Sequence, residues 1–311
     1  MRPAERRDAP VPLAPGLRAA SDLLTASDLR AAGPTVLRMV VGMQLRRFRE
    51  AAGISTEDAG YEIRGSHSKI SRMELGRVGF KERDVADLLT LYGVTDPGVR
   101  GPLLDLADHA NTPGWWQAYG DVVPGWFEPY LGLEQGAEVV RVFEVQDVPD
   151  LLQTPEYARA LITARHPEAS KEEIERRVEL RMARRRVFER PEPLKLWAVL
   201  DEAVLHRAVG GPATLRAQIE HLIEAAERPN VSVQVLPFAA GGHAGESGAV
   251  TLLRFAEPEL PDVVYLEQLT SALYPDRAAD ISRHRDVLNR LGVQAEPPSR
   301  TREILRDLLG A

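Results

Sequence analysis

The stretch "GSHSKISRMELGR", residues 65–77, has the form of a short, capped helix. Ser66 can cap its N-terminus with a side-chain oxygen, and Gly76 is placed to end it. Ile70 and Met73 are spaced to face inward, and the other positions are mainly polar or basic. The stretch is therefore either an ordinary surface helix or a helix that lies in a DNA groove.

The charge of the chain is uneven. The 311 residues carry a formal net charge of −7, which argues against indiscriminate coating of nucleic acid. Between residues 64 and 83, however, six basic residues stand against two acidic ones, a local net of +4. The basic residues are Arg64, Lys69, Arg72, Arg77, Lys81 and Arg83, and the acidic ones are Glu74 and Glu82. A solvated helix face remains an alternative explanation of such a run.

The neighbouring sequence predicts a compact bundle of short helices. Apolar residues recur with a helical period over 34–52, and Gly53 ends that helix. Ser55 caps a second helix that runs to about Ile63, and a fourth helix spans residues 82–92. The second and third helices are joined by the tight turn "RGS". This is the sequence form of a helix-turn-helix.

Three groups of residues resemble the Xre, or lambda-repressor-like, family over roughly residues 36–94: Gly42 with Leu45 and Arg46, then "REAAGIS", then "SKISRMELGR". The chain has Thr56 where that family often has glutamine. The resemblance implies that the third helix enters the major groove of double-stranded DNA, with Arg72 the strongest candidate for reading a base. The DNA-binding residues expected from it are Thr56, Ser66, His67, Ser68, Lys69, Ser71, Arg72 and Arg77. Glu74 is expected to brace the fold by pairing with an arginine such as Arg46.

Composition restricts the class of protein. The chain contains no cysteine, which excludes disulfides, thiolate zinc sites and cysteine nucleophiles. No apolar run approaches the roughly 20 residues that cross a bilayer, and no secretory signal is present, so we expect a cytoplasmic protein without membrane contact. The predicted domains are a flexible arm (1–33), a helix-turn-helix domain (34–96), a helical linker (97–112) and a regulatory domain (113–311).

The segment 115–130 is rich in aromatic residues interleaved with glycine and proline. Its aromatic residues are Trp115, Trp116, Tyr119, Trp126, Phe127 and Tyr130. Such a segment either lines a surface for a ligand or partner, or packs at the edge of the second core.

The second domain is predicted to mix helices and strands. A helix starts at Thr154 and Pro155, a charged and salt-bridged helix covers 170–189, and further helices cover 212–227 and 279–291. Strands are predicted at 194–200, 231–238, 249–255 and 262–268, whereas 133–143 reads as either helix or strand. The predicted fold class is an all-α N-terminal helix-turn-helix bundle followed by an α+β C-terminal domain.

This part of the chain also resembles a known family. "VPDLLQTPEYARAL", "RRVELRMARRR", "LDEAVLHRAVGG", "RPNVSVQVLPF" and "VVYLEQ" are similar to the uncharacterised C-terminal domain of many actinobacterial Xre-type regulators, over roughly residues 113–300. Asp150 stands where that family usually has glycine, and Val250 where phenylalanine is common. The resemblance implies a sensor or partner-binding role, and members are often encoded beside small proteins thought to act with them.

A catalytic second domain is the main alternative. Asp201, Glu202 and His206 follow a predicted strand, and the loop "AAGGHAGESG" adds His243, Glu246 and Ser247. No nucleophile elbow, phosphate loop, dinucleotide fingerprint or H-E-x-x-H motif accompanies them, and Glu202 and His206 are expected to make ordinary hydrogen bonds. We therefore predict a non-enzyme without catalytic residues, metal or cofactor. The expected ligand- or partner-binding residues are Trp115, Trp116, Tyr119, Trp126, Tyr130 and His243.

The sequence thus predicts a sequence-specific, DNA-binding transcriptional regulator. One helix-turn-helix makes few contacts, so a homodimer on a two-fold operator is expected. The C-terminal domain is expected to sense a small-molecule effector or a small protein partner. The alternatives are a regulator with a catalytic C-terminal domain and an antitoxin-like protein acting with a small partner.

Overall fold

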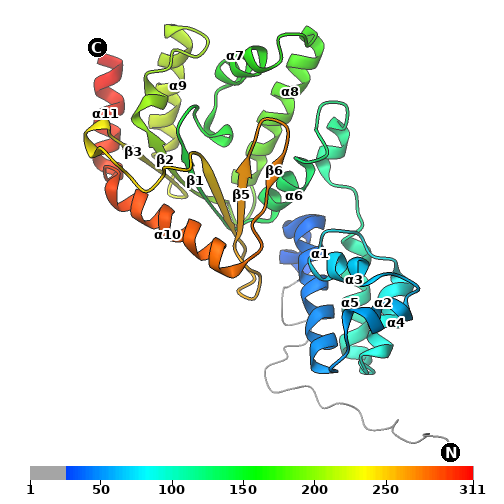
Figure 1. The fold of residues 1–311 in the computed structure, drawn as a ribbon. Coiled ribbons are helices and arrows are strands. Elements are labelled where there is room, and N and C mark those ends of the chain that lie inside the picture. Colours follow the sequence, from blue (N-terminus) through cyan, green and yellow to red (C-terminus); the bar gives the residue numbers. More distant parts are fainter. Residues whose placement is uncertain (1–25, 311) are drawn as a thin grey trace, which may run out of the picture. The chain divides into compact units, whose positions relative to one another are not determined.

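The computed structural model describes residues 26–310, so residues 1–25 of the predicted N-terminal arm lie outside the described residues. The chain divides into two compact units, the first ending at Gly114 and the second beginning at Trp115. The first unit is helical and the second contains a mixed sheet with helices (Figure 1). The predicted fold class is confirmed.

The N-terminal unit is a bundle of short helices. They are α1 (Ala26–Ala51), α2 (Thr56–Glu62), α3 (His67–Glu74), α4 (Glu82–Leu91) and α5 (Pro97–His109). The limits of α2, α3 and α4 agree closely with the sequence prediction. By contrast, α1 starts before residue 34, although Gly33 (φ 73°, ψ 165°) interrupts its helical backbone just ahead of Pro34.

The predicted caps explain why these helices start and stop where they do. The Ser55 hydroxyl accepts a hydrogen bond from the Asp58 backbone at 3.0 Å, and Ser66 accepts one from the Lys69 backbone at 3.2 Å. Gly76 follows α3 with φ +66°, a left-handed conformation that glycine adopts without a steric penalty.

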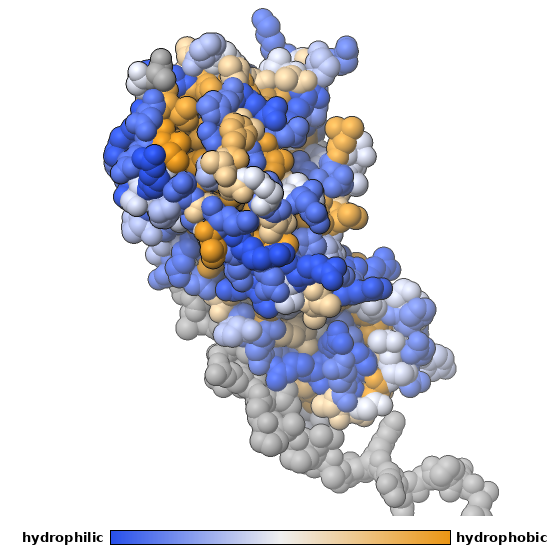
Figure 2. Space-filling model, turned by 60° about the vertical axis from the view of Figure 1, so that its left-hand side comes forward, coloured by the Kyte–Doolittle hydropathy of each residue, from blue (hydrophilic) through white to orange (hydrophobic). Residues whose placement is uncertain are grey.

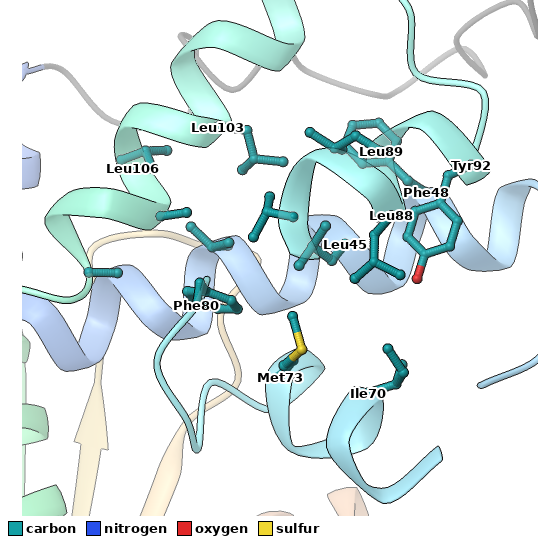
Figure 3. Close-up of a cluster of buried hydrophobic side chains, with 14 of the residues drawn as sticks. Leu45, Phe48, Ile70, Met73, Phe80, Leu88, Leu89, Tyr92, Leu103 and Leu106 are labelled. Carbon is teal, nitrogen blue, oxygen red and sulfur yellow. The ribbon is translucent and has the colours of Figure 1, made fainter. Parts of the chain in front are cut away.

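Apolar residues from all five helices form one core in this unit (Figure 3). Ile70 and Met73 of α3 are both about 1% exposed and pack into the cluster that contains Leu45 and Leu88. The helix α5 contributes Leu103 and three neighbouring apolar residues to the same cluster. Each Å² of apolar surface that is buried stabilises the fold by about 25 cal/mol. The buried residues therefore fix one side of α3 in the core, and its opposite side stays exposed.

The C-terminal unit contains six strands and six α-helices among its described residues. The strands are β1 (Val139–Glu144), β2 (Lys195–Asp201), β3 (Val231–Leu236), β4 (Val250–Arg254), β5 (Val263–Glu267) and β6 (Ala272–Leu273). The helices are α6 (Glu128–Gly136), α7 (Pro155–Arg165), α8 (Lys171–Arg184), α9 (Pro212–Ala225), α10 (Ala278–Gln294) and α11 (Pro298–Gly310), and η4 (Arg185–Phe188) is a 3₁₀ turn.

The strands form a single mixed sheet in the order β3-β2-β1-β4-β5-β6. β1, β2 and β3 run parallel, and β4 lies antiparallel on the other side of β1. In this register Phe143 pairs with Val199 on one side and with Val250 on the other. The three parallel strands are rich in buried valine and leucine, as expected of strands that are covered on both faces.

The two faces of the sheet are covered by different helices. Leu288 and Leu291 of α10 pack on the face that carries Phe143 and Val199. Figure 1 shows α10 along this face, with α7, α8 and α9 on the opposite side of the sheet. On that opposite side Tyr130 of α6 contacts Tyr265 of β5, with ring centroids 4.3 Å apart.

The ambiguous segment 133–143 is both helix and strand, because it contains the end of α6 and most of β1. The four predicted strands and the helices at 212–227 and 279–291 are confirmed as β2 to β5, α9 and α10. The predicted start of a helix at Thr154 and Pro155 is also confirmed, since the Thr154 hydroxyl accepts a hydrogen bond from the Tyr157 backbone.

Candidate nucleic-acid interface

Helix α3 is held closely against α1. A Cβ atom on Gly42 of α1 would lie 2.4 Å from the Met73 carbonyl oxygen, so only glycine allows this approach. At the end of α3, Glu74 accepts two hydrogen bonds from the Arg49 guanidinium, at 2.5 and 2.9 Å. The prediction that Glu74 pairs with an arginine is confirmed, but Arg46 was the wrong partner because it pairs with Glu50 at 2.8 Å.

The turn between α2 and α3 is similarly tight. A Cβ atom on Gly60 would lie 2.9 Å from the Ser66 carbonyl carbon. Close packing here and at Gly42 fixes the orientation of α3, which a groove-reading helix requires.

The exposed side of α3 carries most of the side chains predicted to contact DNA. Ser66, His67, Ser68, Ser71 and Arg72 are all exposed. The Ser68 hydroxyl lies 3.2 Å from His67 Nε2, and Arg72 Nε donates to the Ser68 carbonyl at 3.3 Å. No ion pair engages the Arg72 guanidinium within residues 26–310, so its remaining N–H groups can donate to a base edge.

Two predicted residues are engaged within the protein. The Lys69 ammonium lies 2.5 Å from Asp84 of α4, and the Lys69 side chain is only 32% exposed. The Thr56 hydroxyl, at the start of α2, donates to Glu57 at 3.1 Å. Lys69 therefore ties α3 to α4, and Thr56 holds the first turn of α2. Arg77 is exposed after Gly76, and its backbone N–H donates to the Arg72 carbonyl.

Arg64 was not predicted as a site residue. It is exposed in the α2–α3 turn with φ +53°, and it is the one non-glycine residue of the described chain with a positive φ. The described residues place no hydrogen bond or ion pair on its side chain. The sequence feature that could have indicated Arg64 as a site residue is its place in the turn "RGS", where a left-handed backbone would favour glycine.

Comparison with known families agrees with this geometry. A helix-turn-helix domain matches residues 40–100, which include α2, α3 and the turn between them. The domain of unknown function DUF5753 matches residues 127–307, more than half of the chain. The chain belongs to the DUF5753 family. No curated protein and no solved structure matches it. The helix-turn-helix domain indicates DNA binding and a role in transcription regulation.

The aromatic residues predicted to bind a ligand or partner divide into two groups. Trp116 and Tyr130 are buried, at 4% and 6% exposure. Trp116 belongs to a small hydrophobic cluster with Leu131 and Leu180, and Tyr130 packs against Tyr265. Trp115, Tyr119 and Trp126 are only partly buried. Trp115 meets the Trp116 and Tyr119 rings edge-on, with centroids about 6 Å apart. Part of the segment is thus core, and part of it reaches the surface.

His243 lies apart from this aromatic segment. Its ring packs edge-on to Phe143, its Nδ1 accepts a hydrogen bond from the Gly245 backbone at 3.1 Å, and its Nε2 lies 4.0 Å from Asp201. Glu202 accepts a hydrogen bond from the Phe238 backbone at 2.6 Å, which confirms its predicted ordinary role. The residues that the catalytic alternative would use are therefore partly engaged in holding the 238–248 loop.

Helix α8 of the DUF5753 domain is salt-bridged, as predicted. Arg176 pairs with Asp121, Arg177 with Glu173, Arg181 with Asp150, and Arg184 with both Glu134 and Asp150. These pairs neutralise four of the arginines that a second nucleic-acid surface would need, and leave Arg185 and Arg186 without a described ion pair. No helix within residues 26–310 is long and apolar enough to span a membrane.

Proposed function

We propose that this protein is a sequence-specific transcriptional regulator that binds double-stranded DNA as a homodimer through α3. The observation that carries the proposal is the division of α3 into two sides. Ile70 and Met73 anchor one side in the core, whereas His67, Ser68 and Arg72 stand exposed on the other. An anchored helix with an exposed polar side is the arrangement that reads base edges in the major groove.

Four basic residues would contact DNA at this interface. The Arg72 guanidinium can pair with O6 and N7 of a guanine. Arg64, in the turn ahead of α3, would contact a phosphate, as would Arg77 after it. Lys69 would contact DNA from a fixed position, because Asp84 holds its ammonium group.

A homodimer is proposed because α3 has only eight residues and reads one half-site. Two copies related by a two-fold axis would read a palindromic operator with half-sites about 34 Å apart. Such binding takes place where chromosomal DNA is, so we propose a cytoplasmic protein.

The test is a binding-site selection with wild type, Arg72→Ala and Lys69→Ala. Arg72→Ala should weaken operator binding by about 1–3 kcal/mol and relax base preference at one position of each half-site. Lys69→Ala should weaken binding to all sequences similarly. If Arg72→Ala returns an unchanged motif, Arg72 does not read a base.

We further propose that the DUF5753 domain senses a ligand or a small protein partner and has no catalytic role. Support comes from Trp115, Tyr119 and Trp126, which are partly exposed in the same C-terminal unit just ahead of the DUF5753 match, since aromatic side chains dominate recognition surfaces. In the view of Figure 2, several separate groups of hydrophobic residues lie among hydrophilic ones on the surface of the C-terminal unit. An antitoxin-like role with a small partner protein belongs to the same proposal.

Native mass spectrometry of the protein purified from its own host tests the sensing role directly. A retained effector would add a few hundred daltons or less, whereas a protein partner would add several thousand. A homodimer that carries no added mass, and whose operator affinity does not change on addition of a host extract, would contradict the proposal.

A further inference from the structure

The DUF5753 domain contains a recess that the aromatic segment does not line. Its volume is about 350 Å³, and it lies where α7 begins, where α8 passes into η4, and just beyond the end of α9. The lining residues are Pro155, Met182, Arg185, Phe188, Glu189 and Arg228. A volume in this range suits a small organic molecule.

Arg185 differs from the arginines before it. Arg176, Arg177, Arg181 and Arg184 each have a carboxylate within 4.0 Å, whereas no described carboxylate lies that close to Arg185. Burial lowers the pKa of Arg185, the nearby Arg228 lowers it further, and Glu189 offsets only part of this effect. The recess therefore holds a half-buried cation whose charge is not neutralised by an ion pair.

The neighbours of Arg185 give it no ion pair, since Glu189, the acid that attracts its charge, lies beyond 4.0 Å. Its Nη2 lies 3.3 Å from His221 Nε2, and its Nη1 lies 4.0 Å from the Met182 sulfur. Burial and the adjacent Arg185 lower the pKa of His221, so this imidazole is neutral at pH 7 and its Nε2 can accept a hydrogen bond from the guanidinium. Glu189 is the one carboxylate of the lining, against the two arginines.

The rest of the lining is apolar or electropositive. Arg228 packs over the Phe188 ring at 6.0 Å, and Met182 and Phe188 provide an apolar wall. Pro155 is the first residue of the eleven-residue helix α7, so the end of α7 that carries a partial positive charge borders the recess.

A purely structural reading accounts for only part of this arrangement. Arg185 and Arg228 follow the C-terminal ends of α8 and α9, where helix dipoles favour cations. That explains why two arginines tolerate one another. It does not explain why they line an open recess together with an apolar wall.

We propose that this recess binds a small organic oxyanion, with a carboxylate or phosphate group between Arg185 and Arg228 and an apolar body against Met182 and Phe188. Arginine guanidinium groups match the planar geometry of such oxyanions. The proposal deepens the sensing role and rests on it for any effect on transcription. The binding itself is measured without DNA.

The experiment titrates the full-length protein with benzoate and with phenyl phosphate by isothermal calorimetry. Benzylamine has the same ring with the opposite charge and serves as the ligand control. We expect saturable binding of at least one of the two anions and none of benzylamine. The anion that binds more tightly identifies the preferred oxyanion as a carboxylate or a phosphate.

Variants locate the site. Arg185→Gln and Arg228→Gln should each weaken anion binding by about tenfold or more, because each removes charge-assisted hydrogen bonds. Arg186→Gln is the matched control, since Arg186 is exposed beside Arg185 but does not line the recess. If Arg185→Gln does not fold, the exposed Arg228 provides the deciding variant.

The proposal is overturned if neither anion binds the wild type, if benzylamine binds equally well, or if Arg186→Gln loses as much affinity as Arg228→Gln. A parallel titration of the wild type with operator DNA keeps the two proposals separate. Failure of DNA binding there would reject the regulatory function and leave the result for the recess unchanged.

Discussion

Arg64 keeps a backbone conformation that an arginine adopts only at a cost. With φ +53° it occupies the left-handed region, where a side chain costs roughly 1–2 kcal/mol and glycine costs little. Strained residues are often retained where their side chain has a function. Arg64 lies three residues before the start of α3, the helix proposed to read the groove, so a phosphate contact is the natural candidate for that function.

Replacing Arg64 by glycine should therefore have opposite effects on stability and on DNA binding. Arg64→Gly should raise the free energy of unfolding by about 0.5–1 kcal/mol, since released strain exceeds the added chain entropy. It should also weaken operator binding. The dependence of the binding constant on salt concentration should become weaker by the amount expected for about one phosphate contact. Arg64→Ala keeps the strain and loses only the guanidinium. If both variants bind the operator as tightly as the wild type, the Arg64 side chain does not contact DNA, and its strain has another cause.

Glu144, at the end of β1, is an acid whose folded environment opposes its charge. Burial, followed by the nearby Asp150, Asp147 and Glu267, raises the pKa of Glu144 to about 8. The folded protein therefore holds a proton that the unfolded chain releases above its ordinary pKa of about 4.3. Stability must fall as the pH rises from about 4.3 to about 8, and this loss is complete above pH 8.

Glu144→Gln should remove this dependence. The variant should be more stable than the wild type at pH 8 by about 4–5 kcal/mol, and the two should converge toward pH 4. His166 and His221 have lowered pKa values and act in the opposite direction over part of this range. Only the difference between the two proteins, from urea unfolding at several pH values, isolates Glu144. A constant difference across the range would contradict the assignment.

Among the helices of the DUF5753 domain, α8 makes ion pairs of two very different kinds. Arg184 and Glu134 are 4% and 2% exposed and join α8 to α6 through hydrogen bonds of 2.7 and 2.8 Å. Arg159 and Glu175 join α7 to α8 with equally short bonds, but their side chains are 40% and 51% exposed. The two ion pairs have similar geometry but different solvent exposure, so they should contribute differently to the free energy of unfolding.

Urea unfolding of Glu134→Gln and Glu175→Gln compares the two pairs. Glu134→Gln leaves a buried guanidinium with a poorer partner and should lower the free energy of unfolding by about 3–5 kcal/mol. Glu175→Gln, at the exposed pair, should lower it by at most about 1 kcal/mol. Equal losses in the two variants would mean that Asp150, the second partner of Arg184, already satisfies the buried charge.

Local signals in the sequence predicted helices and strands well, and contacts between distant residues poorly. Ser55, Ser66 and Gly76 determine where helices start and stop through bonds within a few residues, so their effect can be read from sequence. The segment 133–143 was ambiguous because one short apolar run spans a helix end and a strand. The helix α11 and the two-residue strand β6 were not predicted, the latter being too short to show a period.

The candidate sites show the same limit. The exposed side of α3 follows from helical spacing, and its residues were predicted. Lys69 was predicted only as a DNA-binding residue, because nothing in the sequence shows that α4 places Asp84 beside its ammonium group. The recess between Arg185 and Arg228 joins residues from separate helices, so only the folded chain reveals that they lie together.

The two units have separate hydrophobic cores, which suggests a division of labour between them. The N-terminal core includes apolar residues of α5, up to Ala110, so a fragment that ends at residue 100 would lose part of it. A fragment of residues 26–114 keeps that core complete. The arginines of α8 in the other unit are largely paired with acids, and so offer little to a phosphate backbone.

We therefore expect DNA binding to reside in residues 26–114 alone. This fragment should bind operator DNA with an affinity that falls steeply as the salt concentration rises, because each phosphate contact releases bound counterions. The logarithm of the binding constant should fall with the logarithm of the salt concentration with a slope of about −0.9 for each phosphate contact. Its affinity should be lower than that of the full-length protein if the second unit supplies the dimer contact. Residues 115–311 should show no salt-dependent binding in the same fluorescence anisotropy titration. Salt-sensitive binding by 115–311 would show that the pairs on α8 open to phosphate, and the arginines at 176–186 would then form a second nucleic-acid site.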